Sequence, residues 1–115
     1  MYVFPRNNPN VVKVVVNKRL QALYFSRSPL PFVRESPAQQ DAEKHSFYAH
    51  IGLYAFHAQT LSELVQLPAT PLEMAESLEQ LRWLENGYSI QTVVTDRPAR
   101  GVDTPDDLEE IRKLI

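Results

Sequence analysis

Six polar residues have side chains that could take part in binding or catalysis. They are Arg27, His50, Tyr54, Glu79, Gln80 and Asp103. Arg27 directly follows a predicted strand, at the edge where α/β sheets place their ligands. A guanidinium binds a carboxylate or a phosphate through two parallel hydrogen bonds. The alternative is a surface arginine that pairs with a nearby acid, and the residues alone favour that alternative.

His50 and Tyr54 are four residues apart on one face of a predicted strand, with the small Gly52 between them. This face leaves room for a ligand to approach. The opposite face is predicted to be the core face and carries Ile51, Leu53 and Ala55. A lone histidine on a strand is more often structural than catalytic, so both interpretations stay open.

Glu79 and Gln80 lie within a predicted helix, beside leucines that are expected to point into the core. The simplest interpretation is a solvated helix face on which Glu79 pairs with Arg82 at i,i+3 spacing. Asp103 immediately precedes another predicted helix, where a carboxylate commonly caps the helix or complements its dipole. Gly101 permits a tight turn that could aim the Asp103 side chain into a cleft.

Four strands are predicted to position these side chains. The β-branched run 11–16 and the segment 20–25 flank a polar turn and predict a hairpin. Near-continuous valine in the first of them predicts burial on both faces. The aromatic-rich segment 47–56 predicts a third strand and 89–95 a short fourth one. The proline-containing segment 26–44 predicts a functional or interface loop.

Three helices are predicted from capping signals. Thr60 to Glu63 has the spacing of a capping box, and Pro68 is expected to end that helix. Thr70-Pro71-Leu72-Glu73 opens a second helix that is expected to end at Asn86-Gly87. Its predicted buried positions are Met74, Leu78, Leu81 and Leu84. Thr104-Pro105 opens the last helix, for which the predicted buried stripe is Leu108, Ile111 and Ile115.

The predicted order of strands and helices indicates an α/β layered fold. It lacks the repeated βαβ start of a complete doubly wound domain, which indicates the second half of a larger fold. At 115 residues the chain is expected to form a single domain or fragment, residues 1–115.

Composition excludes several classes of protein. The 12 basic and 14 acidic side chains give a formal net charge of −2, which argues against a nucleic-acid binder. No apolar run approaches the ~20 residues that cross a bilayer, so no membrane span is expected. The absence of cysteine excludes thiolate metal sites and fits a reducing cytoplasm, where we expect the protein to act.

Four strings in a fixed order resemble the carboxy-terminal half of one enzyme family. The strings are Tyr24–Phe32 (YFSRSPLPF), His50–Phe56 (HIGLYAF), Leu78–Arg82 (LEQLR) and Gly101–Leu108 (GVDTPDDL). Together they are similar to the 3-deoxy-manno-octulosonate (Kdo) cytidylyltransferases, also called CMP-Kdo synthetases, from about Asn10 onward. The resemblance implies a nucleotide-diphospho-sugar transferase-like (Rossmann-like) fold, of which this chain would form the second half.

The resemblance implies that CTP and Kdo react to give CMP-Kdo and pyrophosphate, in lipopolysaccharide biosynthesis. It makes Arg27 a Kdo or phosphate contact, and His50 a sugar-binding residue with Tyr54 as its companion. The Glu79-Gln80 pair would hydrogen-bond sugar hydroxyls. Asp103 would be the catalytic aspartate that binds Mg²⁺, an ion that also needs oxygens from substrate phosphates. A cytoplasmic homodimer is expected.

The glycine- and arginine-rich nucleotide loop of that family and its second metal-binding aspartate have no counterpart here. The chain is therefore expected to lack the CTP-binding half and to be inactive alone. Two alternatives stay open. One is a cytidylyltransferase for another acid sugar, such as sialic acid. The other is a non-enzymatic module of this fold that binds a partner or itself through an exposed sheet edge.

Overall fold

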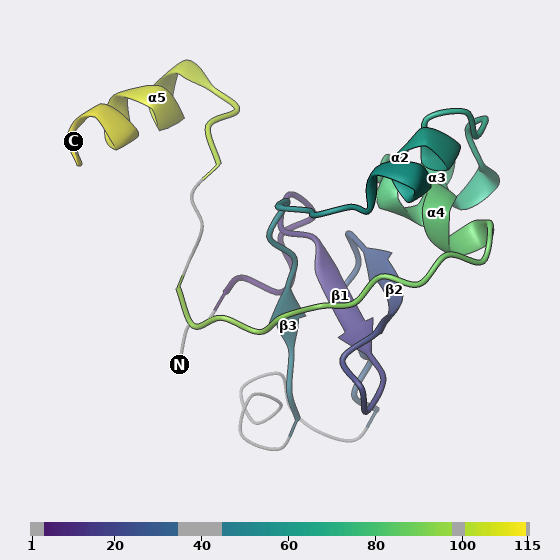
Figure 1. Ribbon diagram of the computed structural model, residues 1–115. Helices are drawn as coiled ribbons and strands as arrows, with labels where there is room; N and C mark the ends of the chain where they lie inside the picture. The colour runs from purple at the N-terminus through teal and green to yellow at the C-terminus, as the bar shows by residue number, and fades with distance from the viewer. Residues whose placement is uncertain (1–3, 35–44, 98–100, 115) are drawn as a thin grey trace.

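The computed structural model describes residues 4–34, 45–97 and 101–114. Within these residues, strands β1 (Lys13–Val16), β2 (Ala22–Ser26) and β3 (Tyr48–Ala49) precede four helices. The helices are α2 (Ala58–Leu64), α3 (Pro71–Glu76), α4 (Gln80–Glu85) and α5 (Pro105–Arg112). Figure 1 shows α2, α3 and α4 gathered beside the sheet, with α5 apart from them.

The three strands form an antiparallel sheet in the order β2-β1-β3. The predicted hairpin of β1 and β2 is confirmed, with Val14 opposite Phe25. The Asn17 side-chain oxygen accepts the backbone N–H groups of Arg19 and Gln21, both at 2.9 Å, and so shapes the turn. This local hydrogen bonding is why Asn favours turns.

The core lies between the hairpin and the α3–α4 pair. Its buried residues are Val14, Ala22, Phe25, Leu78 and Leu81. The prediction that β1 is buried on both faces is confirmed at its start, because the neighbours Lys13 and Val14 are both buried. On the second face, however, the buried side chain is that of a lysine, Lys13, rather than that of a valine. Lys13 Nζ donates to three backbone carbonyls, those of Asn8, Val11 and Arg27.

The predicted start of the first helix is wrong. Helix α2 begins at Ala58, and its N-cap is His57 rather than Thr60. Thr60 therefore lies inside the helix, and the Ser62 hydroxyl donates to the Ala58 carbonyl one turn back. Serine and threonine hydroxyls can hydrogen-bond to the backbone both at a helix N-cap and inside a helix. The capping-box spacing alone therefore did not locate the helix start.

The second predicted helix is interrupted. Glu73 accepts the Thr70 backbone N–H at 3.1 Å, as expected for the carboxylate of a capping box. However, Ser77 adopts the left-handed conformation (φ 54°, ψ 50°) and separates α3 from α4. The break rotates the two halves relative to each other. It leaves Met74 70% exposed, contrary to prediction, while Leu78 and Leu81 are buried as expected.

The predicted stop at Asn86-Gly87 is confirmed. Gly87 has a φ of 85°, and the Tyr88 N–H donates to the Trp83 carbonyl at 3.0 Å. The Gly87 N–H donates to the Leu84 carbonyl, so the end of α4 forms a Schellman motif.

The predicted core face of the third strand is wrong. Strand β3 ends at Ala49, and the Leu53 N–H donates to the Ile51 carbonyl at 2.8 Å, a three-residue turn that interrupts the pleat. Leu53 is 86% exposed and Ala55 is also exposed, whereas His50 and Tyr54 are half-buried. Leu53 and Ala55 therefore do not form the predicted core face, and His50 and Tyr54 are more buried than these two residues.

The predicted fourth strand is reduced to one bridge, between Gln21 and Gln91. The Ala22 N–H donates to the Ile90 carbonyl and the Thr92 N–H donates to the Leu20 carbonyl, both at 2.9 Å. The segment thus lies along the outer edge of β2. The predicted loop over 26–44 is confirmed for residues 26–34, which have no helix and, after Ser26, no strand; residues 35–44 lie outside the described residues.

Helix α5 begins as predicted. The Asp107 N–H donates to the Thr104 hydroxyl, and the Thr104 N–H donates to Asp107, which completes a capping box. The predicted buried stripe is wrong, because no described residue of α5 is buried and Leu108 is 40% exposed. Ile115 lies outside the described residues. In Figure 1 helix α5 stands apart from the strands and other helices of the described residues.

Candidate functional site

A hydrogen bond joins His50 to Tyr54. The Tyr54 hydroxyl and His50 Nε2 are 2.6 Å apart. The His50 backbone N–H donates to the Val12 carbonyl at 2.8 Å, which fixes the residue just past β3 against the start of β1. The edge of Phe25 packs on the imidazole with ring centroids 5.1 Å apart. The pair is therefore held by the sheet and the core, as a positioned site requires.

Aromatic rings from α4 and from the segment after β3 surround Tyr54. Trp83 meets Tyr54 edge-on at 5.2 Å and Phe56 edge-on at 5.3 Å. Tyr54 and Phe56 are stacked at 6.0 Å. These contacts join helix α4 to the His50–Tyr54 pair, and their edge-to-face geometry is the favourable one for aromatic pairs.

The ionisation of this pair is set by burial. Burial lowers the pKa of His50 below its ordinary value. Burial and then the negative charge of Glu79 raise the pKa of Tyr54 to about 12. Both side chains are therefore neutral near pH 7. A neutral imidazole and a phenol form one donor–acceptor pair and keep further donor and acceptor capacity for a ligand.

Glu79 and Gln80 differ in their surroundings, although both stand at the start of α4. Glu79 is exposed, as predicted for a solvated helix face. Gln80 is only 6% exposed, and in the described part of the chain its Nε2 has no hydrogen-bond partner. A buried amide without a partner costs about 1–3 kcal/mol, which a ligand acceptor would offset.

The predicted Glu79–Arg82 ion pair is not the arrangement found. Arg82 instead pairs with Glu73, with Nη2 and Oε2 2.6 Å apart. This pair joins α3 to α4 and lowers the pKa of the Glu73 carboxyl. Glu79 therefore keeps its carboxylate available near Tyr54.

Arg27 lies just past the end of β2, where the sequence predicts it. Three of the five N–H bonds of its guanidinium are directed at backbone carbonyls. Nε donates to Glu76 at 2.7 Å, Nη1 to Pro9 at 3.0 Å and Nη2 to Ser77 at 3.2 Å. Arg27 thus ties the turn before α4 to the sheet, and the bonds from Nη1 and Nη2 lie at the exposed side.

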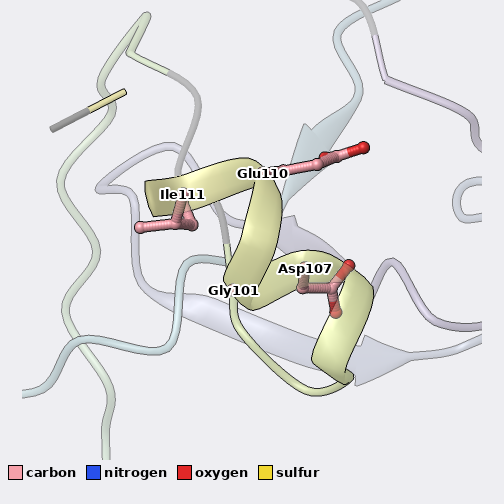
Figure 2. A pocket seen from close by; sticks show the side chains of 4 residues that line it. All are labelled: Gly101, Asp107, Glu110 and Ile111. Carbon is pink, nitrogen blue, oxygen red and sulfur yellow. The ribbon is translucent and has the colours of Figure 1, made fainter. Parts of the chain in front are cut away.

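Asp103 lies two residues before α5, the helix that Figure 1 shows apart from α2, α3 and α4. It is exposed, and its backbone N–H donates to Asp107 at 3.1 Å. A cavity of about 220 Å³ beside it is lined by Gly101, Asp107, Glu110 and Ile111 (Figure 2). Within residues 4–34, 45–97 and 101–114, no three histidine, aspartate or glutamate side chains are grouped to hold a metal ion.

The structure thus brings together three of the six predicted residues, His50, Tyr54 and Glu79, and Gln80 follows Glu79 as the first residue of α4. Together they offer hydroxyl, imidazole, carboxylate and amide groups, which suit hydrogen bonding to a polyhydroxylated ligand. Sequence reasoning missed Trp83 and Phe56 as the aromatic side of this group. The i,i+3 spacing of Gln80 and Trp83 was the available signal. In the part of the chain that the structure describes, no helix is long and apolar enough to span a bilayer.

The lowered pKa of His50 predicts a pH dependence of stability. Below the ordinary pKa of about 6.5 the unfolded chain binds a proton that the folded chain does not, so stability falls as pH falls. We expect the free energy of unfolding to drop between about pH 7.5 and about pH 5.5, measured by urea unfolding. His50→Gln should flatten this dependence, whereas His57→Gln, at an exposed histidine, should not. An equally steep dependence in His50→Gln would contradict the assignment.

Comparison with known proteins gives consistent matches. A family model described as cytidylyltransferase matches residues 6–92. The 3-deoxy-manno-octulosonate cytidylyltransferase of Parabacteroides distasonis is 54% identical over 103 residues, which are 90% of this chain and 41% of the relative. The enzyme of the same name from Chlorobium limicola is 53% identical over 109 residues, 95% of this chain and 42% of the relative.

A solved structure of CMP:2-keto-3-deoxy-manno-octonic acid synthetase, complexed with CTP, superposes with a TM-score of 0.83 and is 46% identical. The match covers 95% of this chain and 43% of that one, and it confirms the predicted α/β nucleotide-sugar transferase fold. The chain thus spans about two fifths of the length of the relatives that it matches.

Proposed function

This chain belongs to the cytidylyltransferase family, and we propose that it forms the acid-sugar-binding part of a 3-deoxy-manno-octulosonate cytidylyltransferase. In the proposed reaction the anomeric hydroxyl of Kdo attacks the α-phosphorus of CTP, giving CMP-Kdo and pyrophosphate. Because the chain spans 41% to 42% of these two relatives, we assign it binding of the sugar and not the complete turnover.

The observation that carries the proposal is the hydrogen-bonded His50–Tyr54 pair beside the start of α4. In the proposal His50, Tyr54, Glu79 and Gln80 bind the hydroxyl groups of the sugar. The buried Nε2 of Gln80 donates to one of them, which supplies the partner that this group lacks in the described structure. Arg27 provides positive charge for the sugar carboxylate or a phosphate.

Asp103 is proposed as a ligand of Mg²⁺, together with phosphate oxygens of the nucleotide. Asp103 suits this role because it is exposed. Its hydrogen bond to Asp107 uses the backbone N–H and leaves the carboxylate for the ion. One carboxylate is a normal protein contribution to an Mg²⁺ site that substrate phosphates complete. The ion would neutralise charge that develops on the transferring phosphate.

The proposal extends to the location, assembly and metabolic role of the intact protein. We propose that the intact protein is a cytoplasmic homodimer that activates Kdo for lipopolysaccharide synthesis. The relatives named as Kdo cytidylyltransferases, with about half of the aligned residues identical, support this choice of sugar.

Gln80→Met provides a test in which binding and stability change in opposite directions. Methionine fills a similar volume without a polar group, so removal of the partnerless amide should stabilise the chain by about 1 kcal/mol. The same change should weaken Kdo binding by roughly tenfold, because one hydrogen bond to the sugar is lost. Isothermal titration with Kdo measures the affinity, and urea unfolding measures the stability.

Gln59→Met, at an exposed glutamine of α2, is the matched control and should change neither quantity. If the wild-type chain takes up Kdo and Gln80→Met has the same affinity, Gln80 is not part of the site. If the wild-type chain takes up no Kdo, the proposed sugar-binding role is wrong.

A further inference from the structure

The last residue of α3, Glu76, connects the helices to the end of β2. Its Oε1 accepts the Arg27 backbone N–H at 3.0 Å, and its backbone carbonyl accepts Arg27 Nε at 2.7 Å. The hydroxyl groups of Tyr24 and Ser26 lie close enough to the Glu76 carboxylate to lower its pKa. The Glu76 carboxylate thus binds the Arg27 backbone at the end of β2 and lies near the side chains of Tyr24 and Ser26 on that strand.

These bonds hold the carboxylate in its charged form. Burial raises the pKa of Glu76, but the hydrogen bonds from Ser26, Arg27 and Tyr24 together with the Arg27 charge lower it below its ordinary value. Burial lowers the pKa of Lys13, and the negative charge of Glu76 raises it by a smaller amount. Charge-assisted hydrogen bonds of this kind are stronger than neutral ones.

Glu76 stands immediately before the left-handed Ser77 that turns the chain from α3 into α4. The Ser77 carbonyl accepts Arg27 Nη2 at 3.2 Å, and the Leu78 N–H donates to the Glu73 carbonyl at 3.2 Å. Both sides of the turn are therefore fixed. Three residues after Glu76 comes Glu79, and then the buried Gln80.

We propose that Glu76 is a positioning residue of the sugar site: by anchoring the α3–α4 turn to β2, it sets Glu79 and Gln80 against the His50–Tyr54 pair. This inference rests on the proposed function, and it adds a residue to that site which does not itself touch the sugar. The anchor is needed because a non-glycine residue in the left-handed region is unfavourable and must be held by its surroundings.

Three variants test this role in the full chain. Glu76→Ala removes every bond of the carboxylate. Glu76→Gln keeps an acceptor for the Arg27 N–H but loses the charge. Glu63→Ala is the matched control, since the Glu63 carboxylate also accepts a hydrogen bond, from the Tyr88 hydroxyl at 2.8 Å, but lies on α2. Kdo affinity is measured by titration, and amide hydrogen exchange is measured over residues 77–81.

Glu76→Ala should weaken Kdo binding by roughly tenfold or more and speed exchange over 77–81, with the hairpin amides of β1 and β2 still protected. Glu76→Gln should recover part of the affinity, and Glu63→Ala should retain all of it. If Glu76→Ala does not fold, Glu76→Gln decides the question, because an affinity equal to wild type would overturn the proposal.

Wild-type affinity in Glu76→Ala, or an equal loss in Glu63→Ala, would overturn the positioning role and leave the proposed function standing. Failure of the wild-type chain itself to bind Kdo would overturn the proposed function, and the positioning role with it. The two failures are thus distinguished by the wild-type titration.

Discussion

Replacing Phe25 by alanine should lower the free energy of unfolding by about 4 kcal/mol. Phe25 is 1% exposed and lies within the core cluster, between the sheet and helices α3 and α4. The change removes a whole aromatic side chain from a site that the hairpin and helices cannot easily close. It also removes the ring that packs against the His50 imidazole. Urea unfolding followed by circular dichroism measures the effect.

Phe32→Ala is the control for this prediction. Phe32 is 85% exposed, so the same chemical change should alter the free energy of unfolding by less than about 0.5 kcal/mol. A loss below about 1 kcal/mol in Phe25→Ala would show that Phe25 does not occupy the core.

Lys13→Met should lower the free energy of unfolding by about 3 kcal/mol or more. Lys13 is fully buried, and its ammonium group donates to the carbonyls of Asn8, Val11 and Arg27. Methionine fills similar space but leaves these three acceptors without their charged donor, and each such bond contributes about 1.5–3 kcal/mol. The desolvation of the ammonium group offsets part of that sum.

Lys18→Met is the comparison, because Lys18 is an exposed residue of the hairpin turn. Thermal unfolding of the two variants should differ clearly, with only Lys13→Met destabilised. Equal stability of the two variants would mean that water replaces the ammonium group among the carbonyls.

The parts of the fold that depend on local interactions were predictable. The hairpin follows from the β-branched run 11–16, the apolar segment 20–25 and the Asn-containing turn between them. The C-terminal end of α4 follows from Gly87, and the start of α5 follows from Thr104. The break at Ser77 was not, because serine carries no strong preference for a left-handed conformation. It is held by contacts with Arg27, which is 50 residues away in the sequence.

The site was predictable in its members more than in its geometry. The spacing of His50 and Tyr54 placed them together, but the turn at Ile51–Leu53 ends the strand pattern and leaves Leu53 exposed. The role of Glu76 could not be predicted, since its partners lie on β2. The Mg²⁺-binding role of Asp103 stays a prediction, because α5 lies apart from the remaining helices.

The contacts of Gln91 and Thr92 with the hairpin turn have a consequence for the order of folding. Gln91 Nε2 donates to the Arg19 and Leu20 carbonyls and the Thr92 hydroxyl donates to the Leu20 carbonyl, across about 70 residues of chain. Closing so long a loop costs more entropy than closing the hairpin. We therefore expect these contacts of Gln91 and Thr92 to form last during folding. We also expect them to break first under mild denaturant, before the core unfolds.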